Sequence, residues 1–198
     1  MNNLHDHYSI IDTLDFRNNI GQLILSYVYR IIALFVFGGL FYGFVQLVHG
    51  TILFEKLVNI ELETVPGFVS ILLLIIDLVF VLYLHEMIHA GVYYCTKGQK
   101  PIIGMRGLVI FAAAPKQMNS RLEMMVNAIA PFAIISLAGL TAVTFLPIEM
   151  ASWVFIPTLI NAAASGGDFM TLGFVLKQDK DASFKDVGDI IYSVLPIK

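Results

Sequence analysis

Residues 66–97 read PGFVSILLLIIDLVFVLYLHEMIHAGVYYCTK, a stretch that begins with a long apolar run. Between Pro66 and Leu84 the single charged residue is Asp77. About 20 apolar residues in a helix cross the hydrocarbon core of a bilayer. We therefore expect residues 66–97 to form a membrane span that is long enough to tilt or to project beyond the membrane. Pro66 suits the first turn of this helix, and Gly98 suits its C-terminal cap.

The chain as a whole is strongly apolar. Of its 198 residues, 58% are hydrophobic and 14% are charged, and the mean hydropathy is +0.79. These values argue against a water-soluble protein. The net charge is −3 and the basic residues form no cluster with aromatics, so nucleic acid is not an expected partner. We expect Cys95, the single cysteine, to be a small buried apolar side chain.

Three further apolar stretches predict three more spans. We place the four spans at about residues 22–48, 66–97, 121–146 and 150–176. No pattern of a cleavable signal peptide precedes the first span, so we expect that span to remain in the mature protein. The chain is predicted to be an all-α membrane protein, with four transmembrane helices in a single domain of residues 1–198.

Two local patterns mark the ends of the third span. Ser120 and Glu123 form a Ser-x-x-Glu capping box, which predicts that a helix opens there. Pro147 is expected to end the same helix, because proline cannot continue it.

Residues 98–120 connect the second and third spans and are rich in glycine and proline. The apolar stretch Leu108–Phe111 predicts one short strand in this connection. The segment from Lys97 to Arg121 is basic and contains no acidic residue, whereas the other two loops are acidic. Positive residues near the ends of spans favour the cytoplasm. We therefore expect a multi-pass protein of the cell membrane, with this connection and both termini on the cytoplasmic side.

The residues with the strongest chemical signal are His85-Glu86-Met87-Ile88-His89, an HExxH pattern inside the second span. Two histidines four residues apart project from one face of a helix, about 6 Å from each other, and can bind the same Zn²⁺ ion. Glu86 then lies close enough to act as the catalytic base toward water at the metal. Ionisable residues inside a span are kept for function or for pairing. The alternative is that the two histidines and the glutamate form a polar patch whose hydrogen bonds are made by neighbouring helices.

Depth in the membrane selects a third metal ligand. Met87, the centre of the motif, lies ten residues before Lys97, and Asp168 lies nine residues before Lys177. At a rise of 1.5 Å per residue, both positions are roughly 15 Å below the cytoplasmic ends of their helices. Because the two spans run in the same direction, we expect Asp168 to join the histidines.

Other carboxylates meet this test less well. Glu123 is the capping-box acid, and Glu149 lies on the opposite side of the membrane. Asp77 is eight residues outward of His85 and about 180° around the helix from Glu86. It is interpreted either as a carboxyl that joins helices or as one that tunes the site, and both interpretations stay open.

Asn161 and Ser165 precede Asp168 at spacings that keep all three side chains on one helical face. One interpretation is that Asn161 binds the substrate backbone or stabilises the developing oxyanion, with Ser165 supporting it. The alternative is ordinary hydrogen bonding between helices.

The HExxH pattern followed downstream by Asn161-Ala-Ala-Ala-Ser165-Gly-Gly-Asp168 resembles the "putative zincin peptidase" family of small bacterial membrane proteins, and more distantly the site-2 intramembrane proteases. The resemblance covers roughly residues 66–185. It implies a zinc site made by the two histidines and Asp168, with Glu86 catalytic. Site-2 proteases usually have their aspartate directly before a glycine among prolines, whereas here Gly167 precedes Asp168.

Together these patterns predict a zinc-dependent, membrane-embedded endopeptidase that acts on membrane or membrane-associated proteins. The strand at Leu108–Phe111 could pair with an extended segment of such a substrate. The alternative is a metal-binding membrane protein without proteolytic activity: a sensor, a transporter, a protective interaction protein, or a relative that binds a partner and does not cut. A transporter is expected to carry several ligand clusters at different depths, and the sequence contains one.

Overall fold

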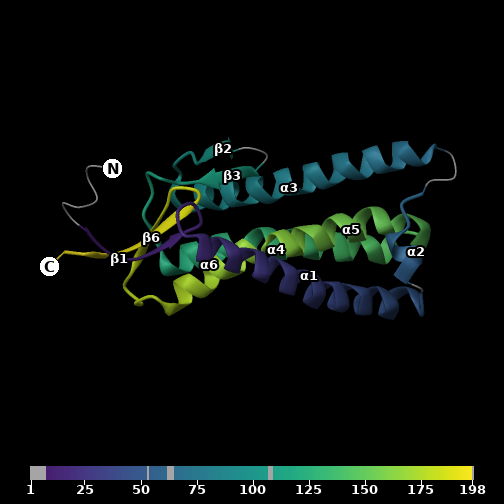
Figure 1. The fold of residues 1–198 in the computed structure, drawn as a ribbon, viewed down its shortest axis with the longest axis horizontal. Helices are drawn as coiled ribbons and strands as arrows, with labels where there is room; N and C mark the ends of the chain where they lie inside the picture. The colour runs from purple at the N-terminus through teal and green to yellow at the C-terminus, as the bar shows by residue number, and fades with distance from the viewer. Residues whose placement is uncertain (1–7, 53, 62–64, 107–108, 198) are drawn as a thin grey trace. The chain divides into compact units, whose positions relative to one another are not determined.

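The computed structural model describes residues 8–52, 54–61, 65–106 and 109–197 (Figure 1). Four stretches of helix are long and apolar enough to cross a membrane, which is consistent with a multi-pass membrane protein and confirms the four predicted helices. They are α1 (Ile20–His49), α3 (Gly67–Lys97), α4 (Arg121–Phe145) and the stretch Ile148–Lys177. A short helix, α2 (Phe54–Val58), follows α1 in the sequence.

The ends of α3 follow the local rules that the sequence predicted. The helix begins directly after Pro66, whose carbonyl accepts the Val69 N–H at 2.8 Å. At the other end Gly98 has a φ of +65°, which favours glycine, and it donates its N–H to the Tyr94 carbonyl at 2.7 Å. The expectation for Cys95 is wrong, because its side chain is exposed on this helix.

The capping box at the start of α4 is also confirmed. The Ser120 N–H donates to Glu123 Oε2 at 2.7 Å, and the Glu123 N–H donates to Ser120 Oγ at 3.3 Å. Lys97 Nζ, in the last turn of α3, lies 2.8 Å from Glu123 Oε1. The acid that caps α4 therefore also ties its first turn to the end of α3.

The fourth predicted span consists of two helices rather than one. Ser165 separates α5 (Ile148–Ala164) from α6 (Gly166–Lys177). Both the N–H and the hydroxyl of Ser165 donate to the Asn161 carbonyl, each at 3.0 Å. The predicted span is present as the stretch Ile148–Lys177, and the interruption at Ser165 places Asp168 in the first turn of α6.

The protein is mostly helical, as predicted, but it also contains a sheet that the all-α prediction did not include. Four antiparallel strands follow the order β1 (Tyr8–Asp15), β6 (Ile190–Pro196), β5 (Ser183–Asp186) and β4 (Asn119–Ser120). Along β5 the side chains alternate between half-buried and buried, as expected for a strand with one covered face. The pairing of β1 with β6 joins opposite ends of the chain, which no local pattern reveals.

A second, two-stranded sheet lies between α3 and α4 in the sequence. It pairs β2 (Ile102–Arg106) with β3 (Val109–Ala113) in antiparallel fashion. The predicted strand Leu108–Phe111 therefore corresponds to most of β3, while Leu108 itself lies outside the described residues. The partner strand β2 was not predicted.

The chain divides into two compact units, each with its own apolar core among the described residues. Unit 1 comprises residues 1–28, 86–131 and 167–198, and unit 2 comprises residues 29–85 and 132–166. The core of unit 1 combines side chains of the four-stranded sheet with side chains of α4 and α6: Leu14, Met124, Met170, Val175, Ala182, Phe184 and Ile191. The core of unit 2 consists of Phe41, Val45, Leu57, Val143, Ala151, Phe155 and Ala162. The single domain of residues 1–198 stays a prediction.

Candidate metal centre

Helix α3 carries both histidines of the HExxH motif one turn apart. Both side chains are buried, with His85 6% exposed and His89 8% exposed. Because the helix is unbroken between them, the backbone itself fixes the spacing of the two imidazoles.

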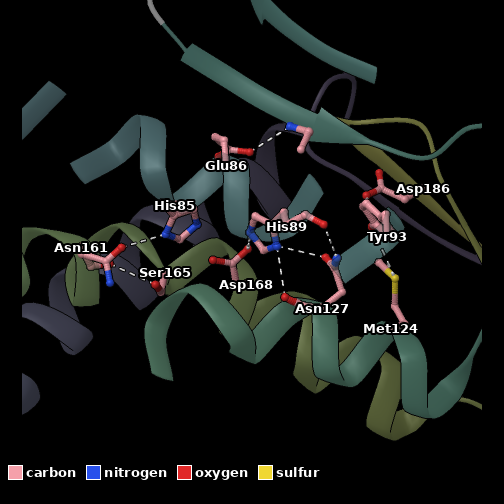
Figure 2. A network of polar contacts seen from close by, with 11 residues as sticks. His85, Glu86, His89, Tyr93, Met124, Asn127, Asn161, Ser165, Asp168 and Asp186 are labelled. Carbon is pink, nitrogen blue, oxygen red and sulfur yellow. Dashed lines mark hydrogen bonds and ion pairs between the residues drawn. The ribbon is translucent and has the colours of Figure 1, made fainter. Parts of the chain in front are cut away.

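His89 is held by Asn127 of α4. Its Nδ1 lies 3.0 Å from Asn127 Oδ1 and 3.1 Å from the Asn127 backbone oxygen, and Asn127 Nδ2 donates to the His89 carbonyl at 3.0 Å (Figure 2). A backbone carbonyl can only accept, so Nδ1 carries the proton and Nε2 keeps its lone pair. This is the tautomer that a metal ligand bound through Nε2 requires. Sequence reasoning missed Asn127, since one asparagine in an apolar helix gives no spacing signal.

His85 is held in the same way by Asn161 of α5. Its Nδ1 lies 2.9 Å from Asn161 Oδ1, and Asn161 is fully buried (Figure 2). The structure thus gives Asn161 a contact with a proposed metal ligand, and the substrate contact suggested by the sequence stays a prediction. Ser165, also fully buried, binds the Asn161 carbonyl and so supports the end of the helix that carries it.

Asp168 faces the motif from the first turn of α6. Its Oδ1 lies 3.3 Å from His89 Nε2. His85, His89 and Asp168 each offer one ligand atom, and these atoms all lie within 4.8 Å of one another. A carboxylate at the first turn of a helix is also stabilised by the helix dipole.

These three side chains fit a zinc ion. Two imidazoles and one carboxylate are a known protein ligand set for catalytic zinc, which leaves a coordination position open. In both histidines Nδ1 is engaged by an asparagine, which leaves Nε2 as the ligand atom. The sequence selected the ligand set His85, His89 and Asp168 by spacing and depth, and the structure brings the same three residues together.

Glu86 accepts a hydrogen bond from the edge of the small sheet. Its Oε2 lies 2.8 Å from the Ala112 backbone N, which belongs to β3 (Figure 2). The Ala112 N–H points away from β2, because an N–H that donates to Glu86 cannot also donate to the neighbouring strand. The catalytic candidate is therefore oriented by a backbone group, in contact with a strand that the sequence had associated with substrate.

Three successive turns of α3 contact α4, starting at the last residue of the motif. His89 contacts Asn127, the Tyr93 hydroxyl lies 3.9 Å from Met124 Sδ, and Lys97 pairs with Glu123. These contacts recur every four residues along α3, so one stripe of the helix is fixed against its neighbour in unit 1.

Asp186 of β5 is a second group that the sequence did not select. It is buried and accepts a hydrogen bond from the Tyr93 hydroxyl through Oδ2 and from the Gly188 N–H through Oδ1 at 2.7 Å. Burial raises the pKa of the Asp186 carboxyl to about 6, although both hydrogen bonds act in the opposite direction. Nothing in the local sequence marks this aspartate, because its partner lies 93 positions away.

The three other carboxylates that the sequence offered as ligands, Glu123, Asp77 and Glu149, have different surroundings. Glu123 makes the capping box and the Lys97 ion pair described above. Among the described residues, Asp77 of α3 has no hydrogen-bonding or ionic partner, so its suggested role in joining helices finds no contact there. Glu149 lies in the first turn of α5, at the opposite end of that helix from Asn161.

The sequence pattern of a family described as "putative zincin peptidase" matches residues 78–183, more than half of the chain and the whole of the motif. The chain belongs to this family. Membership indicates a metallopeptidase and therefore zinc, in agreement with the ligand set above. No curated protein and no solved structure matches the chain.

Proposed function

We propose that this protein is a zinc-dependent endopeptidase, embedded in the membrane, that hydrolyses peptide bonds of membrane or membrane-associated proteins near the cytoplasmic face. One observation carries the proposal. His85, His89 and Asp168 converge within 4.8 Å, next to Glu86, in a helix that is long and apolar enough to cross a membrane.

A zinc ion held by these side chains would supply Lewis-acid chemistry, which makes water more acidic and a peptide carbonyl more electrophilic. The residues of the chain do the remaining work. Asn127 and Asn161 keep both imidazoles in the orientation that presents Nε2. Glu86 takes a proton from water and passes it to the leaving amine, as a general base and then a general acid.

The outer edge of β3 is suited to bind an extended segment of the substrate. Along a β-strand the N–H and C=O groups of successive residues point to opposite edges, so residues two apart share an edge. Since Ala112 directs its N–H to Glu86, Ile110 directs its own backbone groups to the same edge. A substrate strand paired there would lie next to the proposed base, and its backbone hydrogen bonds would not depend on its sequence.

Mass spectrometry of new protein N-termini tests the proposal without knowledge of the substrate. Membranes from cells that produce the wild type are compared with membranes that contain Glu86→Gln, which keeps the fold and the ligands but removes the base. We expect N-termini in the wild-type sample that are absent from the variant. Ile110→Pro, which removes one outer donor of β3, should reduce their yield.

Zinc content of the purified proteins separates the enzyme from the alternatives. Wild type and Glu86→Gln should hold one zinc per chain, and Asp168→Ala should lose it. Asp181→Ala, an exposed acid in the same unit, is the matched control and should retain zinc. Identical N-termini in wild type and Glu86→Gln, with zinc bound in both, would instead support a metal-binding protein without proteolytic activity.

A further inference from the structure

The turn between β5 and β6 contacts two parts of the candidate site at once. In this turn Gly188 has a φ of +96°, and the Val187 N–H donates to the Ile190 carbonyl at 3.0 Å. Asp186 Oδ1 accepts the Gly188 N–H at 2.7 Å, so the turn is closed by both backbone and side-chain bonds. Residues 186–189 lie outside the segment that matches the family.

The first contact of the turn is with the helix that carries Glu86. Asp186 Oδ2 accepts the Tyr93 hydroxyl hydrogen, and Tyr93 is 1% exposed (Figure 2). A hydrogen bond to a carboxylate is stronger than one between two neutral groups. Tyr93 follows His89 by one turn on the same face of α3, so the bond holds the turn to the end of the motif.

The second contact is with the strand that donates to Glu86. A Cβ at Gly188 would lie 3.2 Å from Cδ2 and Cε2 of Phe111, and a Cβ at Gly104 would lie 2.6 Å from Phe111 Cζ. The ring of Phe111 therefore lies against two glycines, one in β2 and one in the β5–β6 turn. The next residue in β3 is Ala112, whose N–H binds Glu86.

We propose that the β5–β6 turn is a positioning element of the active site, which holds α3 through Tyr93 and β3 through Phe111 and so sets the distance between Glu86 and the Ala112 amide. The substrate edge of β3 is thereby placed by the sheet that the two ends of the chain build. The effect of this turn on substrate binding rests on the proposed function, whereas the positioning of β3 is a property of the fold.

Hydrogen exchange of the full-length protein in detergent micelles tests the first contact. Tyr93→Phe removes the hydroxyl that binds Asp186 and keeps the ring. We expect the backbone amide hydrogens of residues 109–113 to exchange about tenfold faster, because the loss of one hydrogen bond makes local opening of β3 more favourable. Tyr94→Phe is the matched control, because Tyr94 is 54% exposed, and it should exchange like the wild type.

Substitutions that change side-chain size around Phe111 test the second contact. They remain informative if Tyr93→Phe does not fold. Gly104→Ala should displace Phe111 and accelerate exchange of residues 109–113, and Phe111→Leu, which removes the ring that lies against the turn, should also accelerate it. Wild-type exchange in folded Tyr93→Phe, or in Gly104→Ala, would overturn the proposal. These rates do not depend on catalysis, so they decide the positioning whether or not the wild type generates new N-termini.

Discussion

His85 and His89 are the same residue type, one turn apart on α3, yet their surroundings differ. Asn127 contacts His89 at both the ring and the backbone carbonyl, whereas Asn161 contacts His85 through one oxygen. The Asn161 Nδ2 is buried without a partner among the described residues. The comparison indicates that Asn127 fixes both the ring and the backbone of His89, whereas Asn161 fixes the ring of His85.

The same difference extends along the helix. From His89 to Lys97 each turn of α3 contacts α4, and the buried pair Tyr93 and Asp186 adds the sheet. Between Gly67 and His85 most side chains of α3 are exposed, including Ile71, Ile75 and Val79. Variants of residues on the two sides of this boundary should therefore differ in their effects.

The largest effect is expected from the buried carboxyl of Asp186. Its pKa is raised from 3.8 to about 6 in the folded protein, so the folded state binds the proton more tightly than the unfolded state. The free energy of unfolding is then highest below about pH 4, falls as the pH rises toward 6 and levels off above it, by about 3 kcal/mol at most. Chemical unfolding in detergent between pH 4 and 7 should show this decline in the wild type.

The control for this prediction is Asp186→Asn, which keeps an acceptor for Tyr93 but cannot ionise. The difference in unfolding free energy between the two proteins should change over the same pH range, because all other groups titrate in both. Parallel curves would show that Asp186 does not titrate between these values.

Loss of the Asn127 side chain should weaken zinc binding by roughly 10–100-fold, the usual effect of removing the partner of a histidine ligand. Asn127→Ala removes all the side-chain bonds that fix the ring and backbone of His89. Competition with a chelator of known affinity measures the change. Ser136→Ala is the matched control, since Ser136 is also buried in α4 but its hydroxyl has no partner among the described residues.

Asn161→Ala should have a smaller effect, about tenfold, at the lower end of the same range. It removes one bond to His85 and also removes a buried amide group that lacks a partner, which partly offsets the loss. The same chelator competition applies. Equal losses in Asn161→Ala and Asn127→Ala would contradict the contrast between the two histidines.

The residues that the sequence predicted are those whose signal is local. The HExxH spacing and the depth of Asp168 depend only on helical geometry, and α3 and α6 end at Lys97 and Lys177, where the depth estimate had placed their ends. Capping residues such as Ser120 act on their own helix, and their predicted bonds are present. Such features need no knowledge of the tertiary fold.

The missed features depend on residues that are distant in the sequence. Strand β1 pairs with β6, and Tyr93 binds Asp186 across 93 positions, so neither is visible in any window of the chain. The break at Ser165 was missed because Asn161 to Asp168 has the spacing of a regular helix. The change lies in the backbone of Ser165, where a φ of −64° and a ψ of 0° end α5.

The smallest effect is expected from a hydroxyl of unit 2 that lacks a partner. Ser152 of α5 is fully buried and its Oγ has no hydrogen bond to the described residues, so Ser152→Ala should leave the free energy of unfolding unchanged or raise it by less than about 1 kcal/mol. Thr158→Val on the same helix is the contrast, because Thr158 Oγ1 donates to the Val154 carbonyl at 2.7 Å. Thr158→Val should lower the free energy of unfolding by about 1 kcal/mol. If chemical unfolding shows that Ser152→Ala is the more damaging variant, the Ser152 hydroxyl stabilises unit 2 and this prediction is wrong.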